Sequence, residues 1–177
     1  FRPIDPGYQT IWLDLTMPLD ERLGSLRANW RHALTKAERS SIEIVVDQDT
    51  SQLKWLTAHH VHDMRRRRYI GPSAALLAKL GESTAAHDDF RLIRALYLGK
   101  PIAGGLFIRH GQAATYLVGW SGKIGRKYNA QHAILWRALD ELERSGVKQL
   151  DLGGLNPKRA AGVTYFKRGL VTPADHE

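Results

Sequence analysis

The short spacing between neighbouring β-forming segments in the middle of this chain is the feature that most restricts its fold. Three such segments occupy residues 90–98, 102–109 and 113–120, and only the turns Gly99-Lys100-Pro101 and His110-Gly111-Gln112 separate them. Connections this short join neighbouring antiparallel strands, whereas a parallel pair needs a crossover of about a dozen residues. The sequence therefore predicts a three-stranded antiparallel meander.

A pronounced amphipathic helix follows the meander, over residues 128–144. Its apolar residues recur at steps of three and four, which places them on one face; they are Ala130, Ile134, Leu135, Ala138, Leu139 and Leu142. Asn129 is a candidate N-cap, and Gly146 lies just beyond the helix, where glycine commonly ends helices. Residues 147–152 form the next predicted strand, so the meander leads into a strand–helix–strand unit.

The first half of the chain predicts a mixture of strands and helices. Residues 9–15 and 42–46 are rich in β-formers. The helical spacing of apolar residues from Leu19 to Ala37 predicts one continuous helix. Further helices are expected from Thr50 or Ser51 into residues 65–68 and over 73–80, and residues 162–169 form a short amphipathic segment. With 43% hydrophobic residues, we expect one α/β domain over residues 1–177, with a mixed, mainly antiparallel central sheet flanked by helices.

The distribution of charge points to an anionic partner. The formal net charge is +8, and no Asp or Glu occurs between Phe90 and Leu139, where eight Lys and Arg fall. If the third strand of the meander leads into the helix start, residues 121–129 form a Gly-containing loop whose free N–H groups and helix dipole favour phosphate. Its cations are Lys123, Arg126 and Lys127, and the guanidinium of Arg126 suits a diphosphate. The alternative is a solvated basic loop without a ligand.

Two other clusters have open interpretations. Four arginines end the helix that is expected to start at Thr50 or Ser51; they are Arg65, Arg66, Arg67 and Arg68. They suit tRNA or an anionic membrane surface, or they complement the helix dipole and stay solvated. His59, His60 and His62 lack the Glu and the third ligand of a recognisable zinc motif. We therefore predict no metal site.

The cysteine content and the apolar segments of the chain both bear on its cellular location. The chain has no cysteine, which fits a reducing compartment. No charged-then-apolar segment opens the given sequence, so we expect no signal peptide, and no apolar run reaches the roughly 20 residues that span a bilayer. We expect a cytoplasmic protein, with contact to the inner membrane face left open.

The basic loop resembles the phosphate-binding motif of the GNAT acyltransferases. That motif, Gln/Arg-x-x-Gly-x-Gly/Ala, holds the pyrophosphate of acetyl-CoA. The corresponding residues here run from Arg126 to Gln131, with Asn129 at the central glycine and Gln131 at the last small residue. The resemblance implies that Arg126, Lys127, Lys123 and Asn129 bind the donor.

A resemblance to the FemABX-like transferases covers almost the whole chain. The shared residues are Arg31-x-x-Leu34-x-Lys36-Ala37, Tyr116-x-x-Gly119, Leu135-Trp136-x-Ala138-Leu139, Gly146-x-x-x-Leu150-Asp151-Leu152-Gly153-Gly154 and Gly162-Val163-x-x-Phe166-Lys167-x-Gly169. Members of this family add amino acids from aminoacyl-tRNA to the peptide of a cell-wall precursor. They usually carry two GNAT-like halves, and this chain matches the second, so a second half or a further copy of the chain is an implied partner.

The resemblance implies roles for several residues. The lysine of the Phe-Lys motif, here Lys167, lies near the reacting ester and stabilises negative charge, as acyl transfer to an amine requires. Asp151 either orients or deprotonates the amine, or it only initiates the turn that follows. Tyr116, Tyr128 and Phe166 are candidates for the substrate wall, although core packing is the competing role for Tyr116.

The expected function is acyl or aminoacyl transfer to an amine, with aminoacyl-tRNA or acyl-CoA as donor and no tightly bound cofactor. Two alternatives remain, an acyl-CoA-dependent N-acyltransferase and a half-domain that binds without catalysing.

Overall fold

Thirteen helices and strands make up the part of the chain that the computed structural model describes, residues 8–172, 175 and 176. The predicted domain limits, 1 and 177, lie outside these residues. In chain order the elements are β1 (Trp12–Asp14), α1 (Leu19–Ser25), α2 (Ala28–Glu38), β2 (Ile42–Asp47), α3 (Leu53–Arg67), α4 (Ala74–Ala85), β3 (Phe90–Tyr97), β4 (Lys100–His110), β5 (Ala113–Ser121), α5 (Lys123–Lys127), α6 (Ala130–Arg144), β6 (Gln149–Asp151) and α7 (Ala161–Arg168).

One six-stranded sheet runs through the centre of the fold, in the order β1-β6-β5-β4-β3-β2. All neighbours pair antiparallel except β5 and β6, which are parallel. The predicted meander of β3, β4 and β5 is confirmed, and so is the strand–helix–strand unit of β5, α6 and β6. The fold is therefore the mixed, mainly antiparallel α/β architecture that the sequence predicts.

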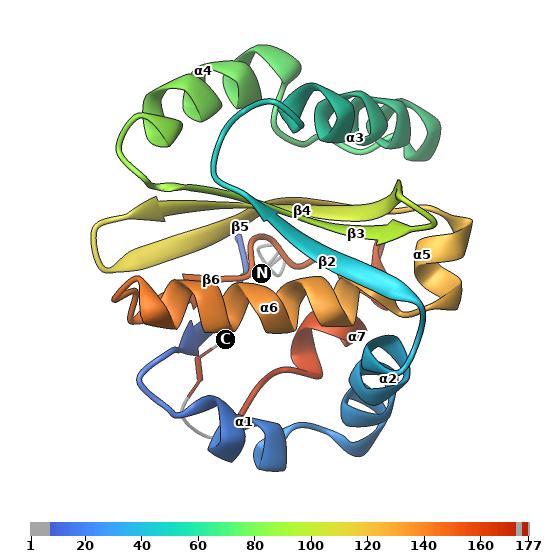
Figure 1. The fold of residues 1–177 in the computed structure, drawn as a ribbon, viewed down its shortest axis with the longest axis vertical. Helices are drawn as coiled ribbons and strands as arrows, with labels where there is room; N and C mark the ends of the chain where they lie inside the picture. The colour runs from blue at the N-terminus through green and yellow to red at the C-terminus, as the bar shows by residue number, and fades with distance from the viewer. Residues whose placement is uncertain (1–7, 173–174, 177) are drawn as a thin grey trace, which may run out of the picture.

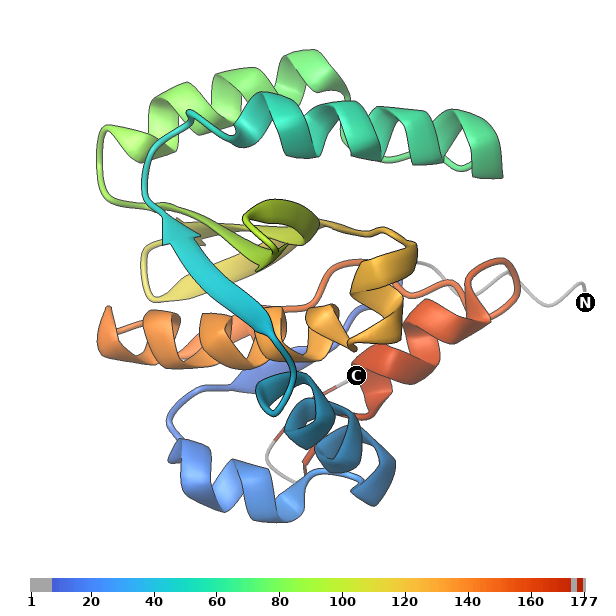
Figure 2. The same cartoon turned by 45° about the vertical axis from the view of Figure 1, so that its right-hand side comes forward.

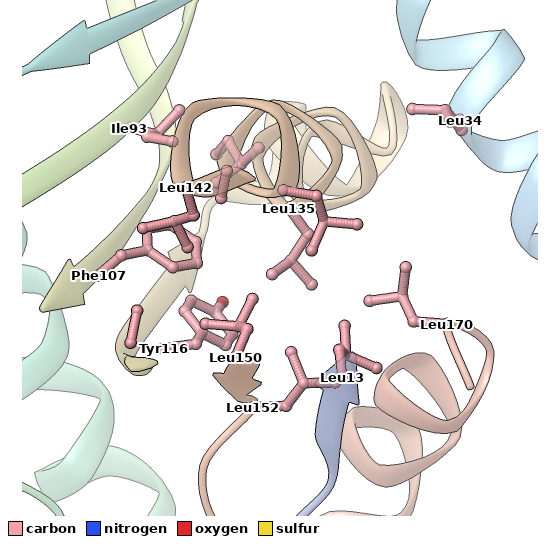
Figure 3. Packing of buried hydrophobic residues seen from close by; sticks show 14 of the residues in the cluster. Leu13, Leu34, Ile93, Phe107, Tyr116, Leu135, Leu142, Leu150, Leu152 and Leu170 are labelled. Carbon is pink, nitrogen blue, oxygen red and sulfur yellow. The ribbon is translucent and has the colours of Figure 1, made fainter. Parts of the chain in front are cut away.

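Helices cover both faces of this sheet. α3 and α4 lie on one face, and α6 lies on the other, with α1, α2 and α7 beyond it (Figure 1). The larger cluster of buried side chains lies between α6 and the sheet and extends to β1, β6 and α7, as Figure 3 shows for Leu13, Leu135 and Leu150. A smaller cluster fills the space under α3 and α4. The predicted apolar face of α6 is buried completely, which fixes this helix against the strands.

The prediction of one continuous helix from Leu19 to Ala37 is wrong. Leu26 and Arg27 adopt extended backbone, with ψ of 149° and 140°, and separate α1 from α2. Leu26 is 3% exposed, so the break turns an apolar side chain into the core. The guanidinium of Arg31 donates to the carbonyls of Gly24 and Leu26, which satisfies backbone groups that the break leaves without helical partners.

Element boundaries differ elsewhere from the sequence-based expectation. Most of the expected loop 121–129 is the short helix α5, and α6 begins at Ala130. Asn129 occupies the N-cap position of α6 in the left-handed region (φ 53°), without a capping hydrogen bond from its side chain. α4 extends to Ala85, beyond the predicted end at residue 80.

A buried ion pair ties the end of the chain to α1. Arg22 and Asp175 have fully buried side chains, with 2.9 Å between Nη1 and Oδ2. The second guanidinium nitrogen of Arg22 donates to the carbonyl of Asp14, at 2.6 Å. None of the helices in the described part of the chain combines the length and apolar character needed to cross a bilayer.

Candidate functional site

The parallel strands β5 and β6 pair over only three positions and then separate. Their register runs from Ala113 opposite Gln149 to Thr115 opposite Asp151. Beyond that point, β5 continues to Ser121 while the chain after β6 turns away. A pocket of about 440 Å³ opens beside the separated part of β5. Its walls come from α3, β5, α5, α6 and α7, which meet on one side of the molecule (Figure 2).

Tyr116 forms part of the pocket wall and also belongs to the core. Its ring stacks on Phe107 with a centroid distance of 5.0 Å and points among the buried leucines in Figure 3. A bulge in β5, where the register shifts between the pairs Leu106–Val118 and Phe107–Tyr116, changes the direction of the strand here. The ring then passes over Gly119, where a Cβ atom would lie 1.7 Å from the tyrosine oxygen. Glycine at this position therefore makes room for the pocket wall.

Lys167 is the buried cation of the pocket. It lies on α7, is 7% exposed, and its ammonium donates to the carbonyls of Gly153 and Gly154 at 3.1 and 3.0 Å. The nitrogen lies 6.0 Å from the centroid of the Tyr116 ring. Burial lowers the pKa of Lys167 to about 8, although the charge of Asp151 acts in the opposite direction. The ammonium form therefore still predominates at neutral pH.

Asp151 organises the turn that holds Lys167. Its carboxylate accepts hydrogen bonds from the backbone N–H of Gly153, at 2.7 Å, and from the hydroxyl of Thr10. Gly153 has a φ of 71°, a conformation that suits glycine, and the turn aims its carbonyl at Lys167. Asp151 does not line the pocket, and it affects the lysine through its charge and through this turn.

The mouth of the pocket is basic. Arg126 on α5 and Arg67 on α3 line it, together with Asp63 as the one carboxylate among the lining residues. Asp63 already pairs with Arg67, at 3.5 Å. One nitrogen of Arg126 donates to the carbonyl of Ser121 at 2.6 Å, and the side chain is otherwise exposed. Cations from two elements that are distant in sequence thus converge here.

The other residues expected to bind the donor or the substrate divide into two groups. Asn129 and Phe166 line the pocket, as do Tyr116 and Arg126. Lys123, Lys127 and Tyr128 do not. Tyr128 packs against Tyr97, with 5.1 Å between ring centroids, and the ammonium of Lys127 lies 5.4 Å from the Tyr128 ring.

Sequence reasoning missed several polar residues of the pocket. The amide nitrogen of Gln131 donates to the carbonyls of Gly104 and Trp120, so this side chain joins α6 to β4 and β5. His132 packs between Trp30 and Phe166, and burial lowers its pKa to about 4, which keeps it neutral. Their signal in the sequence is a pair of polar residues in the first turn of an otherwise apolar helix face.

The histidines near the end of α3 have separate surroundings. His59 stacks on Trp120 with a centroid distance of 3.8 Å, whereas His60 is buried and contacts the carbonyl of Pro72. Within residues 8–172, 175 and 176, no three side chains of the metal-ligating kinds come together.

Comparison with solved structures finds the same fold in acyl-transferring and related proteins. The crystal structure of FemX superposes with a TM-score of 0.80 at 13% identity, over 98% of this chain and 60% of that one. An aminoglycoside acetyltransferase from an uncultured soil metagenomic sample, in complex with sisomicin, gives 0.58 at 13%, over 77% and 91%. A predicted acetyltransferase with acetyl-CoA from Clostridium acetobutylicum gives 0.51 at 10%, over 69% and 88%.

These comparisons also define how far the likeness extends. The chain spans about 60% of the length of the FemX chain that it matches. A search of curated protein sequences finds no match to this chain. The model of the acetyltransferase (GNAT) domain family matches residues 24–168, which include α2, the whole meander, α6 and Lys167. The chain therefore belongs to the acetyltransferase (GNAT) domain family.

Proposed function

We propose that this domain transfers an aminoacyl group from an ester donor to an amine, as in the FemABX-like reaction. The observation that carries the proposal is the buried ammonium of Lys167, which faces a pocket at the point where β5 and β6 separate. A cation in a partly dry site stabilises a developing oxyanion more strongly than one in water. Tyr116 and Phe166 enclose the same space and keep it apolar.

The reaction places a definite demand on Lys167. The amine nitrogen attacks the carbonyl carbon of the donor, a C–N bond forms, and the carbonyl oxygen becomes negative. Two hydrogen bonds of the ammonium go to Gly153 and Gly154, which leaves its third N–H to donate to that oxygen. The C–O bond to the donor then breaks, and the leaving oxygen takes up the proton that the nitrogen loses.

The basic mouth supports a donor that carries phosphate. Arg126 on α5 and Arg67 on α3 both line the pocket, and guanidinium groups bind phosphate oxygens in a fixed fork geometry. In this proposal Arg126 contacts the donor directly, Asn129 supports it from the start of α6, and Lys123 and Lys127 add attraction from α5. Aminoacyl-tRNA and acyl-CoA both satisfy this requirement.

An acyl-CoA-dependent N-acyltransferase is the second candidate. It is favoured by the likeness to a structure solved with acetyl-CoA, whereas the higher TM-score of FemX favours the aminoacyl donor. With a thioester, the same steps break a C–S bond. The tRNA dependence, the cell-wall peptide acceptor and a second GNAT-like half as partner belong to the first candidate.

Parallel calorimetric titrations test the donor. The purified chain is titrated with acetyl-CoA, with charged tRNA and with a lipid-linked peptidoglycan precursor, at low and moderate salt. Heat with tRNA or precursor but not with acetyl-CoA supports aminoacyl transfer. Saturable acetyl-CoA binding that Arg126→Ala abolishes favours the second candidate.

Substitution of Lys167 tests whether the domain is catalytic. Lys167→Met keeps the length of the side chain and removes the cation, so transfer should fall by about a hundredfold or more, as when one oxyanion donor is lost. Lys79→Met, at an exposed position on α4 that does not line the pocket, is the matched control. Full transfer by Lys167→Met would refute the proposed role, and absent transfer by the unsubstituted chain with intact binding would favour the non-catalytic half-domain.

A further inference from the structure

The connection between α3 and α4 exposes an isoleucine beside a run of arginines. Ile70 is 101% exposed and Tyr69 is 41% exposed. They directly follow Arg65, Arg66, Arg67 and Arg68, all of which are exposed. We call residues 65–70 the α3 tip. A fully exposed branched aliphatic residue contributes nothing to the core, and here it lies next to a half-exposed aromatic ring and four cations, so apolar and basic groups share one surface.

The exposure of Ile70 results from an ordered local structure. The residues around it pack back onto α3: the backbone N–H of Tyr69 donates to the carbonyl of Met64 at 3.3 Å, and the carbonyl of Pro72 lies 3.0 Å from Nε2 of His60. A Cβ atom at Gly71 would lie 3.0 Å from the His60 ring, so the chain there lies flat on the helix. His60 itself is 4% exposed. The tip is thus held on both sides of Ile70, which points away from the protein.

The charge around Ile70 is strongly positive. Arg66 and Arg67 share the carboxylate of Asp63, at 3.3 and 3.5 Å. Arg65 and Arg68 have no ion pair in the described part of the chain. Four arginines against one carboxylate leave a net charge of about +3 next to an apolar residue. Arg68 ends α3 in the left-handed conformation (φ 54°), which directs the chain out of the helix just before Tyr69.

We propose that the α3 tip docks on an anionic lipid bilayer, with Ile70 inserted at the level of the headgroups and the arginines bound to lipid phosphates. Basic residues near an anionic surface and an adjacent apolar side chain contribute together to peripheral binding. RNA explains the arginines and gives the ring of Tyr69 a base to stack on, but it leaves the fully exposed Ile70 without an apolar contact. The proposal does not depend on which acyl group the pocket transfers, although Arg67 belongs to both the tip and the pocket wall.

Docking through the α3 tip would fix the orientation of the pocket relative to the bilayer. Arg67 belongs to the tip and also lines the pocket, and Figure 2 shows the end of α3 on the same side of the molecule as α5 and α7. The mouth of the pocket would therefore lie close to the bilayer surface.

Vesicle co-sedimentation with the purified chain tests the proposal. Vesicles of phosphatidylcholine with about one third phosphatidylglycerol should pellet the chain at low salt, and pure phosphatidylcholine vesicles should not. Ile70→Ser should weaken binding about tenfold, and Ile70→Trp should strengthen it, since tryptophan prefers the interface. Leu23→Ser makes the same kind of change on α1, at the far end of the molecule (Figure 2), and should have no effect.

The arginines are tested by a second pair of variants. Arg65→Gln with Arg68→Gln removes the two unpaired charges and should weaken binding about fivefold for each. Lys36→Gln with Arg39→Gln removes two exposed charges at the C-terminal end of α2 and serves as the control of equal net charge. Unchanged melting temperatures show that the variants fold.

Three results would overturn the proposal. The first is no pelleting with anionic vesicles. The second is equal binding by Ile70→Ser and the unsubstituted chain. The third is tighter binding to an unrelated RNA than to vesicles with no effect of Ile70→Ser, which would make the tip a nucleic-acid surface.

Discussion

Replacing Lys167 by methionine should stabilise the fold at neutral pH, although it removes the proposed catalytic cation. Burial lowers the pKa of Lys167 from 10.5 to about 8, and each pKa unit corresponds to about 1.4 kcal/mol. Keeping the charge at pH 7 therefore costs about 3 kcal/mol relative to the unfolded chain. Methionine avoids this cost and fills similar space, but the carbonyls of Gly153 and Gly154 lose their donor, at about 1 kcal/mol each. A net gain of about 1 kcal/mol remains.

The dependence on pH makes this prediction specific. Between pH 8 and 10.5 the unfolded chain binds more protons at this lysine than the folded chain, so the stability of the unsubstituted protein rises with pH. The difference in stability between Lys167→Met and the unsubstituted protein should accordingly change by about 2 kcal/mol between pH 7 and pH 10, so that the gain of about 1 kcal/mol becomes a loss of about 1 kcal/mol. Urea unfolding at several pH values, followed by fluorescence, measures both quantities.

The control is Lys127→Met, a change of the same kind at an exposed position. It should show no such dependence on pH. A difference between Lys167→Met and the unsubstituted protein that stays constant from pH 7 to pH 10 would refute the reasoning, because it would mean that the lysine is equally charged in the folded and unfolded chains.

Three further outcomes are expected. Transfer activity should fall as the pH rises through about 8, where Lys167 loses its proton; a rate profile that is flat from pH 7 to pH 9 would exclude a cationic role. Gly119→Ala should destabilise by about 1–3 kcal/mol, because the new methyl group overlaps Tyr116; thermal unfolding should show that its cost and that of Tyr116→Ala are not additive. Asp175→Asn should cost about 3–5 kcal/mol by leaving Arg22 buried without its partner. Burial raises the pKa of Asp175, but hydrogen bonds from Arg22 and the backbone outweigh this effect and hold the pKa below its ordinary value of 3.8. The stability that this pair contributes should therefore be lost as the pH of the solution falls below that value.

Local signals predicted most of the elements. The meander follows from the length of two turns, and α6 from a regular apolar face, because both patterns depend only on residues that are neighbours in sequence or one helical turn apart. The break at Leu26 could not be predicted in this way. Its apolar spacing continues from α1 into α2, and only the burial of Leu26 against distant elements selects the extended conformation.

The candidate site was predicted in part for the same reason. The Phe-Lys pair and the turn after Asp151 are short motifs, and the structure brings Lys167 and Phe166 to the pocket. The sequence does not show that Arg67 and Gln131 reach the pocket, since their place in the wall depends on how α3 and α6 pack on the sheet. The roles of Lys123, Lys127 and Tyr128 in binding the donor stay predictions.

The sequence alone determined the mixed α/β class, the antiparallel meander, the strong helix after it and the basic character of the loop between them. These follow from spacing and composition, which act over a few residues. Only the tertiary structure decided that β5 and β6 separate, that a lysine 16 positions after Asp151 is buried against the turn this aspartate organises, and that α3 contributes an arginine to the pocket. These features depend on contacts between residues far apart in the chain. The energies of such contacts come from tertiary packing and not from local conformational preference.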